Sequence, residues 1–193
     1  MSNTIIYYAK KKQQESEKQY WKSFSEIGNS WRGAMFFWRY IEEKYLPSLP
    51  KLDWMRKEDE SYVSRFTMSM CRKESNLNDV WGLFSDKRLS RNERIVLGTT
   101  LDRGYLLFED IPYVVNALNE VSAEMGGNNS LAEQAGALNC LYIHHKDVFC
   151  VVWLQTSVSC MGDVHGEYFG EKEMWNIITD VDEVEKNINS EKN

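Results

Sequence analysis

Two cysteines and two histidines in the second half of the chain could together hold a metal ion. Cys140 and His144 are four residues apart, and Cys160 and His165 follow within one predicted loop. Side chains four residues apart share a helix face, and two thiolates with two imidazoles would make a closed tetrahedral zinc site. However, there is no CxxC pair, and the first two ligands straddle a predicted helix end. Cysteines buried as small hydrophobic side chains are the favoured alternative, so the sequence predicts no metal and no other cofactor.

The predicted loop over residues 155–167 contains side chains that could hydrolyse a substrate. Ser157 or Cys160 would be the nucleophile, His165 the general base and Asp163 the acid that orients this base. Such groups normally come from distant segments, whereas these lie in one loop, and no GxSxG motif surrounds Ser157. A small hydrolase that uses this loop is therefore the alternative hypothesis, and the sequence favours a protein that is not an enzyme.

A cluster of basic residues could contact nucleic acid. Lys87, Arg88, Arg91 and Arg94 fall within eight positions, but acidic residues interrupt them and no aromatic side chains interleave for base stacking. The chain has 29 acidic and 23 basic residues, a net charge of -6. Because phosphate backbones need clustered positive charge, the sequence argues against a nucleic-acid partner.

Aromatic residues are more numerous than one core of this size needs, with 7 Trp and 10 Tyr among 193 residues. Tyrosine and tryptophan are enriched where proteins meet other proteins. We expect Trp54, in a proline-bounded connector, and Tyr168 and Phe169, in a glycine-containing loop, to contact a partner, together with Gln155 at a strand end. The alternative is that these side chains pin loops onto the core.

Periodicity predicts the elements that must position these residues. A capping-box spacing at Ser90 to Glu93 precedes a β-branched run, and we interpret that run as a strand. Helices are expected over 20–27, 31–45, 111–125, 131–141 and 174–184, and strands over 4–9, 95–101, 105–108 and 148–154, with strands 95–101 and 105–108 forming a hairpin. The run 148–154 is apolar on both faces, which predicts a central strand of the sheet. The buried stripe of helix 111–125 is expected to consist of Val114, Val115, Leu118, Val121 and Met125. Runs of helices and strands favour an α+β fold, a helix-rich N-terminal half packed on a small, mostly antiparallel sheet.

The length favours one globular domain over residues 1–193, the alternative being a helical subdomain 1–86 and an α+β subdomain 87–185. No apolar run is long enough to cross a membrane, no secretory signal pattern is recognised, and the four cysteines lack the density of a disulfide scaffold. We therefore expect a cytoplasmic protein without a membrane partner.

The leading hypothesis is a protein-binding module, in its finer form an inhibitor or immunity-type partner of a bacterial toxin, since acidic surfaces can block cationic sites. The sequence leaves the oligomeric state open.

Overall fold

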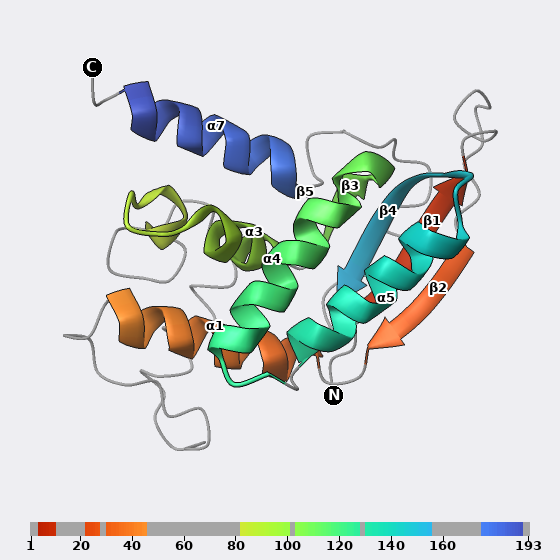
Figure 1. Cartoon of the computed structure of the whole chain (residues 1–193), viewed down its shortest axis with the longest axis horizontal. Helices are drawn as coiled ribbons and strands as arrows, with labels where there is room; N and C mark the ends of the chain where they lie inside the picture. Colours follow the sequence, from red (N-terminus) through yellow and green to blue (C-terminus); the bar gives the residue numbers. More distant parts are fainter. Residues whose placement is uncertain are drawn as a thin grey trace.

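The computed structural model describes residues 4–10, 22–27, 30–45, 82–100, 103–127, 130–155 and 175–190. Within them a five-stranded sheet is combined with α-helices, which confirms the predicted α+β class (Figure 1). The elements in chain order are β1 (Thr4–Lys10), β2 (Lys22–Ile27), α1 (Ser30–Tyr45), the 3-10 helix η2 (Gly82–Ser85), α3 (Arg91–Thr99), β3 (Arg103–Leu107), the 3-10 helix η3 (Phe108–Asp110), α4 (Ile111–Glu124), α5 (Ser130–His144), β4 (Val148–Gln155), β5 (Trp175–Asn176) and α7 (Ile177–Ser190).

The sheet has the order β2-β1-β4-β3-β5, and all its pairs are antiparallel except β3 with β5. The strand β4 lies between β1 and β3, and its residues from Val148 to Trp153 are buried except for the half-buried Phe149. A strand that is apolar on both faces belongs in the middle of a sheet. The predicted central strand is therefore confirmed.

One close contact joins two neighbouring strands of the sheet. Gly104 on β3 pairs with Trp153 on β4, and a Cβ atom at position 104 would overlap the indole ring of Trp153. Ile6 on β1 pairs with the same tryptophan from the other side. The absence of a side chain at Gly104 therefore lets the Trp153 ring lie across the neighbouring strand.

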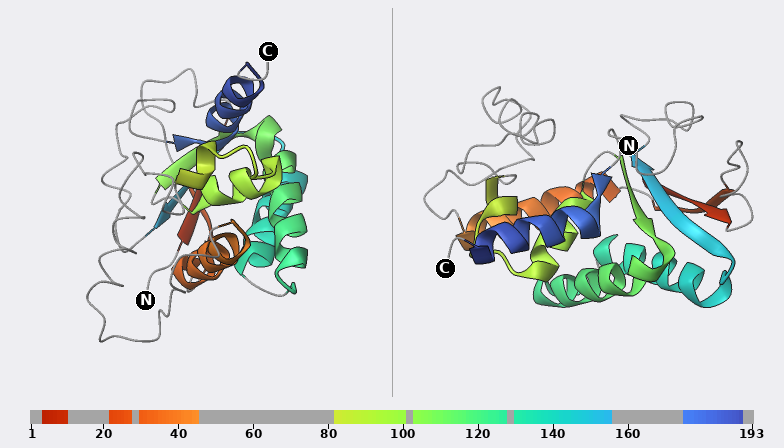
Figure 2. Two further views of the ribbon diagram at one scale, coloured as in Figure 1. Left: turned by 90° about the vertical axis from the view of Figure 1, so that its left-hand side faces the viewer. Right: turned by 90° about the horizontal axis from the view of Figure 1, so that it is seen from above.

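The helices α4 and α5 form an antiparallel hairpin, and the turn between them includes Gly126 and Gly127 at φ of 92° and 70°. Both values lie in the left-handed region that glycine adopts without steric cost. The hairpin packs against one face of the sheet (Figure 1 and Figure 2). The predicted α4 stripe is confirmed at Val114, Leu118 and Val121, which are all buried.

Three further helices pack beside the hairpin, with α3 between α7 and α1 in both figures. On α1 the side chains of Phe37, Trp38 and Ile41 are buried, as expected for a helix that is apolar around most of its circumference. The Trp38 Nε1–H donates to Thr100 Oγ1 at 2.8 Å, so the indole's one polar atom is satisfied inside the core.

Two predicted elements are wrong. The run 95–101, expected as a strand, belongs largely to the helix α3, because the capping box at Ser90 and Glu93 does form and starts a helix there. Its β-branched residues are buried, and burial outweighs their weak strand preference. The expected hairpin is also wrong, since β3 pairs with β4 and β5 instead.

The second wrongly predicted element is the expected helix over 20–27, because residues 22–27 form the edge strand β2. The backbone of this strand pairs with β1, and Phe24 packs edge-on against Tyr8 with ring centroids 6.3 Å apart. Four apolar residues are too few to establish a helical period when a neighbouring strand offers backbone hydrogen bonds.

The described residues test other predictions only in part. Within the described part of residues 1–86 there are two strands, one α-helix and the short η2, so a helix-rich N-terminal half stays a prediction, as does the division into domains. No helix in the described ranges combines the length and apolar character needed to cross a bilayer.

Candidate functional site

Most of the side chains that the sequence suggested for chemistry or binding lie outside the described residues. These are Trp54, Ser157, Cys160, Asp163, His165, Tyr168 and Phe169. Gln155 is described as the last residue of β4, where its backbone pairs with Thr4. The triad, which was the alternative hypothesis, and the four-ligand zinc site, which the sequence disfavoured, are therefore not tested by the described residues.

The first two predicted metal ligands are described, and they lie on one helix. The sequence placed the end of this helix near Leu141, but α5 continues to His144, so that Cys140 and His144 are separated by one full helical turn. Both side chains are exposed, and Cys140 is a free thiol. In the described ranges no group of three or more His, Cys, Asp or Glu could hold a metal ion. The helix therefore offers two candidate ligands on its own.

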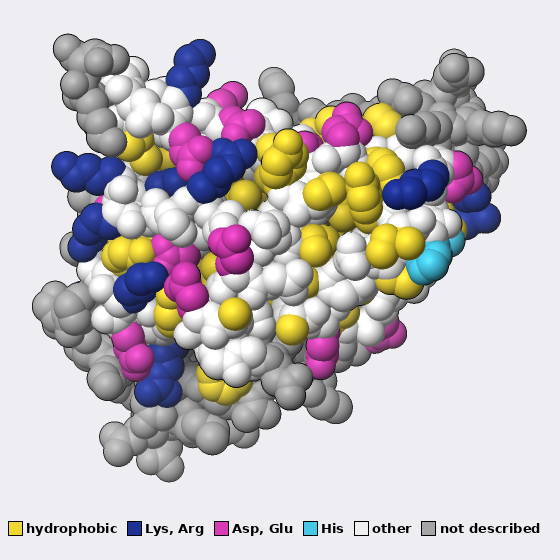
Figure 3. Space-filling model, in the orientation of Figure 1, with side chains coloured by type: hydrophobic (Ala, Val, Ile, Leu, Met, Phe, Trp, Pro, Cys, Tyr) yellow, Lys and Arg dark blue, Asp and Glu magenta, His cyan; other side chains and the backbone are white. Residues whose placement is uncertain are grey.

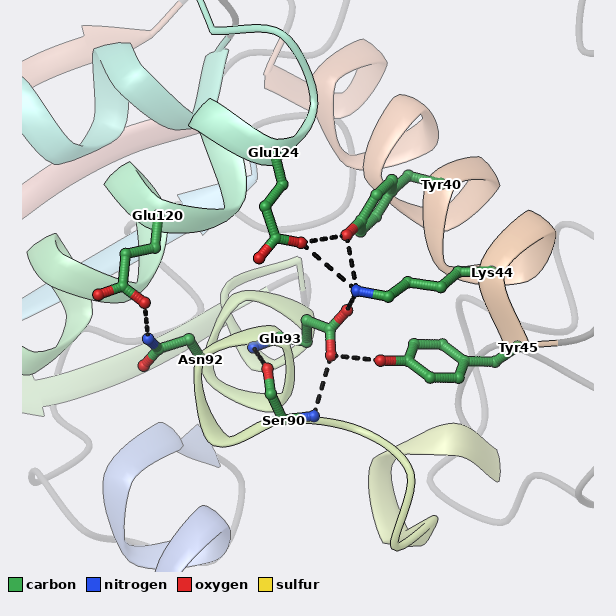
Figure 4. Close-up of polar contacts among 8 residues, drawn as sticks. All are labelled: Tyr40, Lys44, Tyr45, Ser90, Asn92, Glu93, Glu120 and Glu124. Atoms are coloured by element: carbon green, nitrogen blue, oxygen red, sulfur yellow. Dashed lines mark hydrogen bonds and ion pairs between the residues drawn. The ribbon is translucent and has the colours of Figure 1, made fainter.

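A buried polar cluster is built around Glu93 at the start of α3 (Figure 4). The Glu93 side chain is 2% exposed. Its Oε1 accepts from Lys44 Nζ at 2.8 Å, while its Oε2 accepts from the Tyr45 hydroxyl at 2.6 Å and from the Ser90 backbone N–H at 2.9 Å. Residues at the C-terminal end of α1 therefore donate to a carboxylate that is 48 or more residues away in the sequence.

The hydrogen bonds in this cluster outweigh the cost of burial. Burial raises the pKa of Glu93, but donors on Lys44, Tyr45 and Ser90 lower it more, so that the net pKa lies below its ordinary value. For Tyr45, burial and the bond to Glu93 raise the pKa to about 12. An ionised carboxylate whose two oxygens already accept three hydrogen bonds is a poor proton acceptor for a substrate. The cluster joins α1 to α3.

The rim of the cluster extends to α4. Tyr40 donates its hydroxyl hydrogen to Glu124, and Lys44 Nζ lies 3.4 Å from the same carboxylate. One turn earlier on α4, Glu120 accepts from the Asn92 side chain on α3. These exposed contacts tie α4 to α1 and α3, and each adds little because solvent screens them.

A second polar cluster lies on the other side of α3. The buried guanidinium of Arg94 donates from Nε to the carbonyl of Phe84 at 2.7 Å, and from Nη2 to those of Asp86 at 2.9 Å and Leu89 at 3.2 Å. Its Nη1 lies 3.3 Å from Glu185 on α7. The basic run considered as a nucleic-acid surface thus contains a residue that holds the segment 84–89.

Arg91 and Arg88, from the same run, are also committed to contacts inside the molecule. Arg91 pairs with Asp182 at 2.7 Å and with Glu185 at 2.5 Å, both on α7. Arg88 pairs with Asp86 at 2.7 Å and donates to the Tyr45 carbonyl at 3.0 Å. Acidic partners therefore neutralise three of the four basic residues of this run.

A hydrophobic surface lies at the end of the helix hairpin where α4 begins and α5 ends (Figure 3). Tyr113 and Ile143 are 59% and 51% exposed, unusually high for large apolar side chains. At the same end of the hairpin the rings of Phe108 and Tyr142 stack with centroids 4.9 Å apart. We call this surface the hydrophobic band, and its members are Phe108, Pro112, Tyr113, Val115, Tyr142 and Ile143.

A lysine lies over the aromatic part of the hydrophobic band. Lys146 Nζ lies 4.1 Å from the ring centroid of Tyr142 and 5.8 Å from that of Phe108. A cation over an aromatic face is attracted by the negative potential of the ring. The exposed Lys146 therefore adds a positive charge to an otherwise apolar surface.

A small apolar pocket lies between the sheet and the helix hairpin, lined in part by Ile6, Val114, Leu138 and Trp153. Its space is close to that of a single water molecule. The Trp153 Nε1 is buried without a hydrogen-bond partner. We interpret the pocket as a gap in the packing, because it is far smaller than the sites that bind substrates.

Sequence reasoning missed both the Glu93 cluster and the hydrophobic band. The capping-box spacing at Ser90 and Glu93 was the available signal for the first, and reading a helix after it would have placed Glu93 correctly. For the band the signal was weaker, since the exposure of Tyr113 and Ile143 depends on what covers their helices.

No protein-family model matches the chain, and neither a curated protein nor a solved structure matches it.

Proposed function

We propose that the protein is a protein-binding module and that the hydrophobic band contacts its partner. The observation that carries this proposal is the exposure of Tyr113 and Ile143 beside the Phe108–Tyr142 stack. Contiguous exposed apolar surface marks interaction sites, because leaving it in water is unfavourable. Tyrosine is among the residues that contribute most to protein interfaces.

The band also has the polar surroundings of such an interface. Lys146 lies over the Tyr142 ring, and the next residue, Asp147, pairs with Lys10 at the end of β1. Charged groups around an apolar centre give an interface its orientation, whereas the apolar centre gives it affinity. A partner with an apolar anchor and a carboxylate near its edge would complement this surface.

The finer form of the proposal is an inhibitor or immunity-type protein that binds a bacterial toxin. The net charge of -6 supports a cationic partner, since opposite charge speeds encounter and excludes wrong partners. Under this form the net negative charge steers the encounter and the hydrophobic band holds the complex.

A crosslinking experiment tests the proposal. A photoreactive phenylalanine analogue is placed at Tyr113 and, as control, at the exposed Asn187 of α7. We expect crosslinking at position 113 in cells of the source organism to capture a defined protein that the control position does not. The captured protein is then purified, and its affinity for the chain is measured by calorimetry.

Matched charge insertions then locate the contact. Tyr113→Glu and Ile143→Glu should each weaken binding of the captured partner by about tenfold or more, because each places a carboxylate in an apolar contact. Asn187→Glu introduces the same side chain on α7 and should leave the affinity unchanged. Equal effects from all three variants, or full affinity in both band variants, would exclude the band as the binding surface.

A further inference from the structure

We propose that Cys140 and His144 bind Zn²⁺ and that a second copy of this chain supplies the other two ligands. The two side chains lie one helical turn apart at the exposed side of α5. This spacing recurs in protein zinc sites, because it brings both ligands to one side of a helix. The inference does not rest on the proposed partner of the hydrophobic band, although Ile143 belongs to both surfaces.

The outer side of α5 has the composition of a covered surface. Glu133 is the helix's one acidic residue, and there is no lysine or arginine in its 15 residues. Surface helices usually carry charged residues on their solvent face. Here the exposed positions near the two ligands are Gly136, Asn139 and Ile143. Depletion of charge is a mark of interface cores.

Another helix could approach this side closely. A Cβ atom at Gly136, one turn before Cys140, would have no atom of this chain within 4 Å. Two α5 helices could pack antiparallel through the side that carries Cys140 and His144. If the twofold axis crosses this side midway between the two ligands, Cys140 of one copy faces His144 of the other. The four ligand side chains would then lie on facing sides of the two helices, where they could surround one tetrahedral zinc ion.

The ligand set decides in favour of a second copy. Structural zinc is four-coordinate, whereas one helix provides two ligands, and the described residues contain no third in reach. A twofold axis doubles the pair to Cys₂His₂ without any new residue. On binding, each of the two thiols releases its proton to solvent and bonds as a thiolate, each histidine bonds as neutral imidazole, and the zinc remains Zn²⁺ throughout.

The test is zinc titration of the full chain, kept reduced with a phosphine so that no disulfide forms. Calorimetry should give one Zn²⁺ for every two chains, and light scattering should show the mass doubling with zinc and returning to its starting value with a chelator. Co²⁺ in place of zinc should give a thiolate-to-cobalt charge-transfer absorption, which reports the Cys140 bond directly.

Variants separate this site from the other candidate ligands of the chain. Cys140→Ser and His144→Gln should each lower zinc affinity by more than about tenfold and abolish the mass doubling. Asn139→Ser, on the same helix, and the double variant Cys160→Ser with His165→Gln should behave as the unchanged chain.

Three results would overturn the proposal. The first is binding of one Zn²⁺ per chain without dimerisation, and the second is zinc-dependent dimerisation that persists in Cys140→Ser. The third is no binding of zinc at micromolar concentration. All three leave the hydrophobic band untouched, because its test measures affinity for a different protein.

Discussion

The ammonium of Lys44 on α1 lies 2.8 Å from the carboxylate of Glu93 on α3, and this carboxylate is almost fully buried. The pair is asymmetric, since the Lys44 side chain is 41% exposed. The lysine thus remains in contact with solvent while it neutralises a charge inside the molecule. The hydrogen bond to Glu93 raises the pKa of Lys44, which keeps the ammonium protonated at any physiological pH.

Removing the lysine should destabilise the fold. In Lys44→Met the Glu93 carboxylate stays buried with Tyr45 and Ser90 as its remaining donors. We expect the free energy of unfolding to fall by about 1–3 kcal/mol, less than for a fully buried pair because water reaches Lys44. Urea denaturation measures the change. Arg39→Met is the control, because Arg39 and Glu43 form an exposed pair on the same helix and should contribute about 0.3–0.5 kcal/mol. Equal losses in the two variants would contradict this account.

The Glu93 cluster should make stability depend on acid. The pKa of Glu93 is lowered in the folded chain, so its charged form stabilises the fold above the unfolded pKa of about 4.3. This contribution is lost as the pH falls through the lower, folded pKa. In Glu93→Gln the free energy of unfolding should no longer contain this pH-dependent contribution. Denaturation of both proteins between pH 7 and pH 3 checks this, and the difference in unfolding free energy should shrink towards the acid end. A constant difference over this range would show that Glu93 does not titrate as described.

Two glycines should respond in opposite directions to the same change. Gly104→Ala places a methyl group against the buried Trp153 ring, and such overpacking costs about 1–3 kcal/mol. Gly136→Ala adds a methyl group in open space on a helix, where alanine is favoured by about 0.8–1 kcal/mol. Thermal unfolding without added metal should therefore show a lower Tm for the first variant and a higher Tm for the second. Two shifts of the same sign would be incompatible with this packing.

Arg94 should be among the most sensitive positions of the described chain. In Arg94→Met three backbone carbonyls, those of Phe84, Asp86 and Leu89, lose their guanidinium donor. The Asp86 carbonyl still accepts from the Leu89 N–H, so the loss falls mainly on the carbonyls of Phe84 and Leu89. At about 1 kcal/mol or more for each unsatisfied buried acceptor, we expect a loss of about 2 kcal/mol or more. Arg94→Lys should restore little, since one ammonium cannot reproduce the planar fork of donors.

The neighbouring Arg88 provides the control for this experiment. Arg88→Met removes an exposed contact with Asp86 and should cost less than about 1 kcal/mol. Proteolysis with a broad-specificity protease offers a second measurement. Cleavage within 84–89 should accelerate in Arg94→Met and stay unchanged in Arg88→Met. Comparable stability of the two variants would mean that the carbonyl bonds of Arg94 contribute little.

The local sequence pattern was sufficient to predict several elements of this fold. The continuous apolar run 148–154 indicated a central strand, and the spacing of Val114, Leu118 and Val121 indicated one buried helix face. The spacing of Cys140 and His144 likewise predicted a shared helix face, which the extension of α5 to His144 supports. These features depend on residues close in the chain, and so the sequence by itself determined them.

Tertiary contacts decided the rest. The run 95–101 and the segment 22–27 each allow helix or strand, and the choice came from the capping box of α3 in one case and from pairing with β1 in the other. The Glu93 cluster joins residues 48 or more positions apart, and the hydrophobic band exists because other elements leave Tyr113 and Ile143 uncovered. Exposure and long-range pairing are properties of the packed chain, because they depend on which distant segments become neighbours.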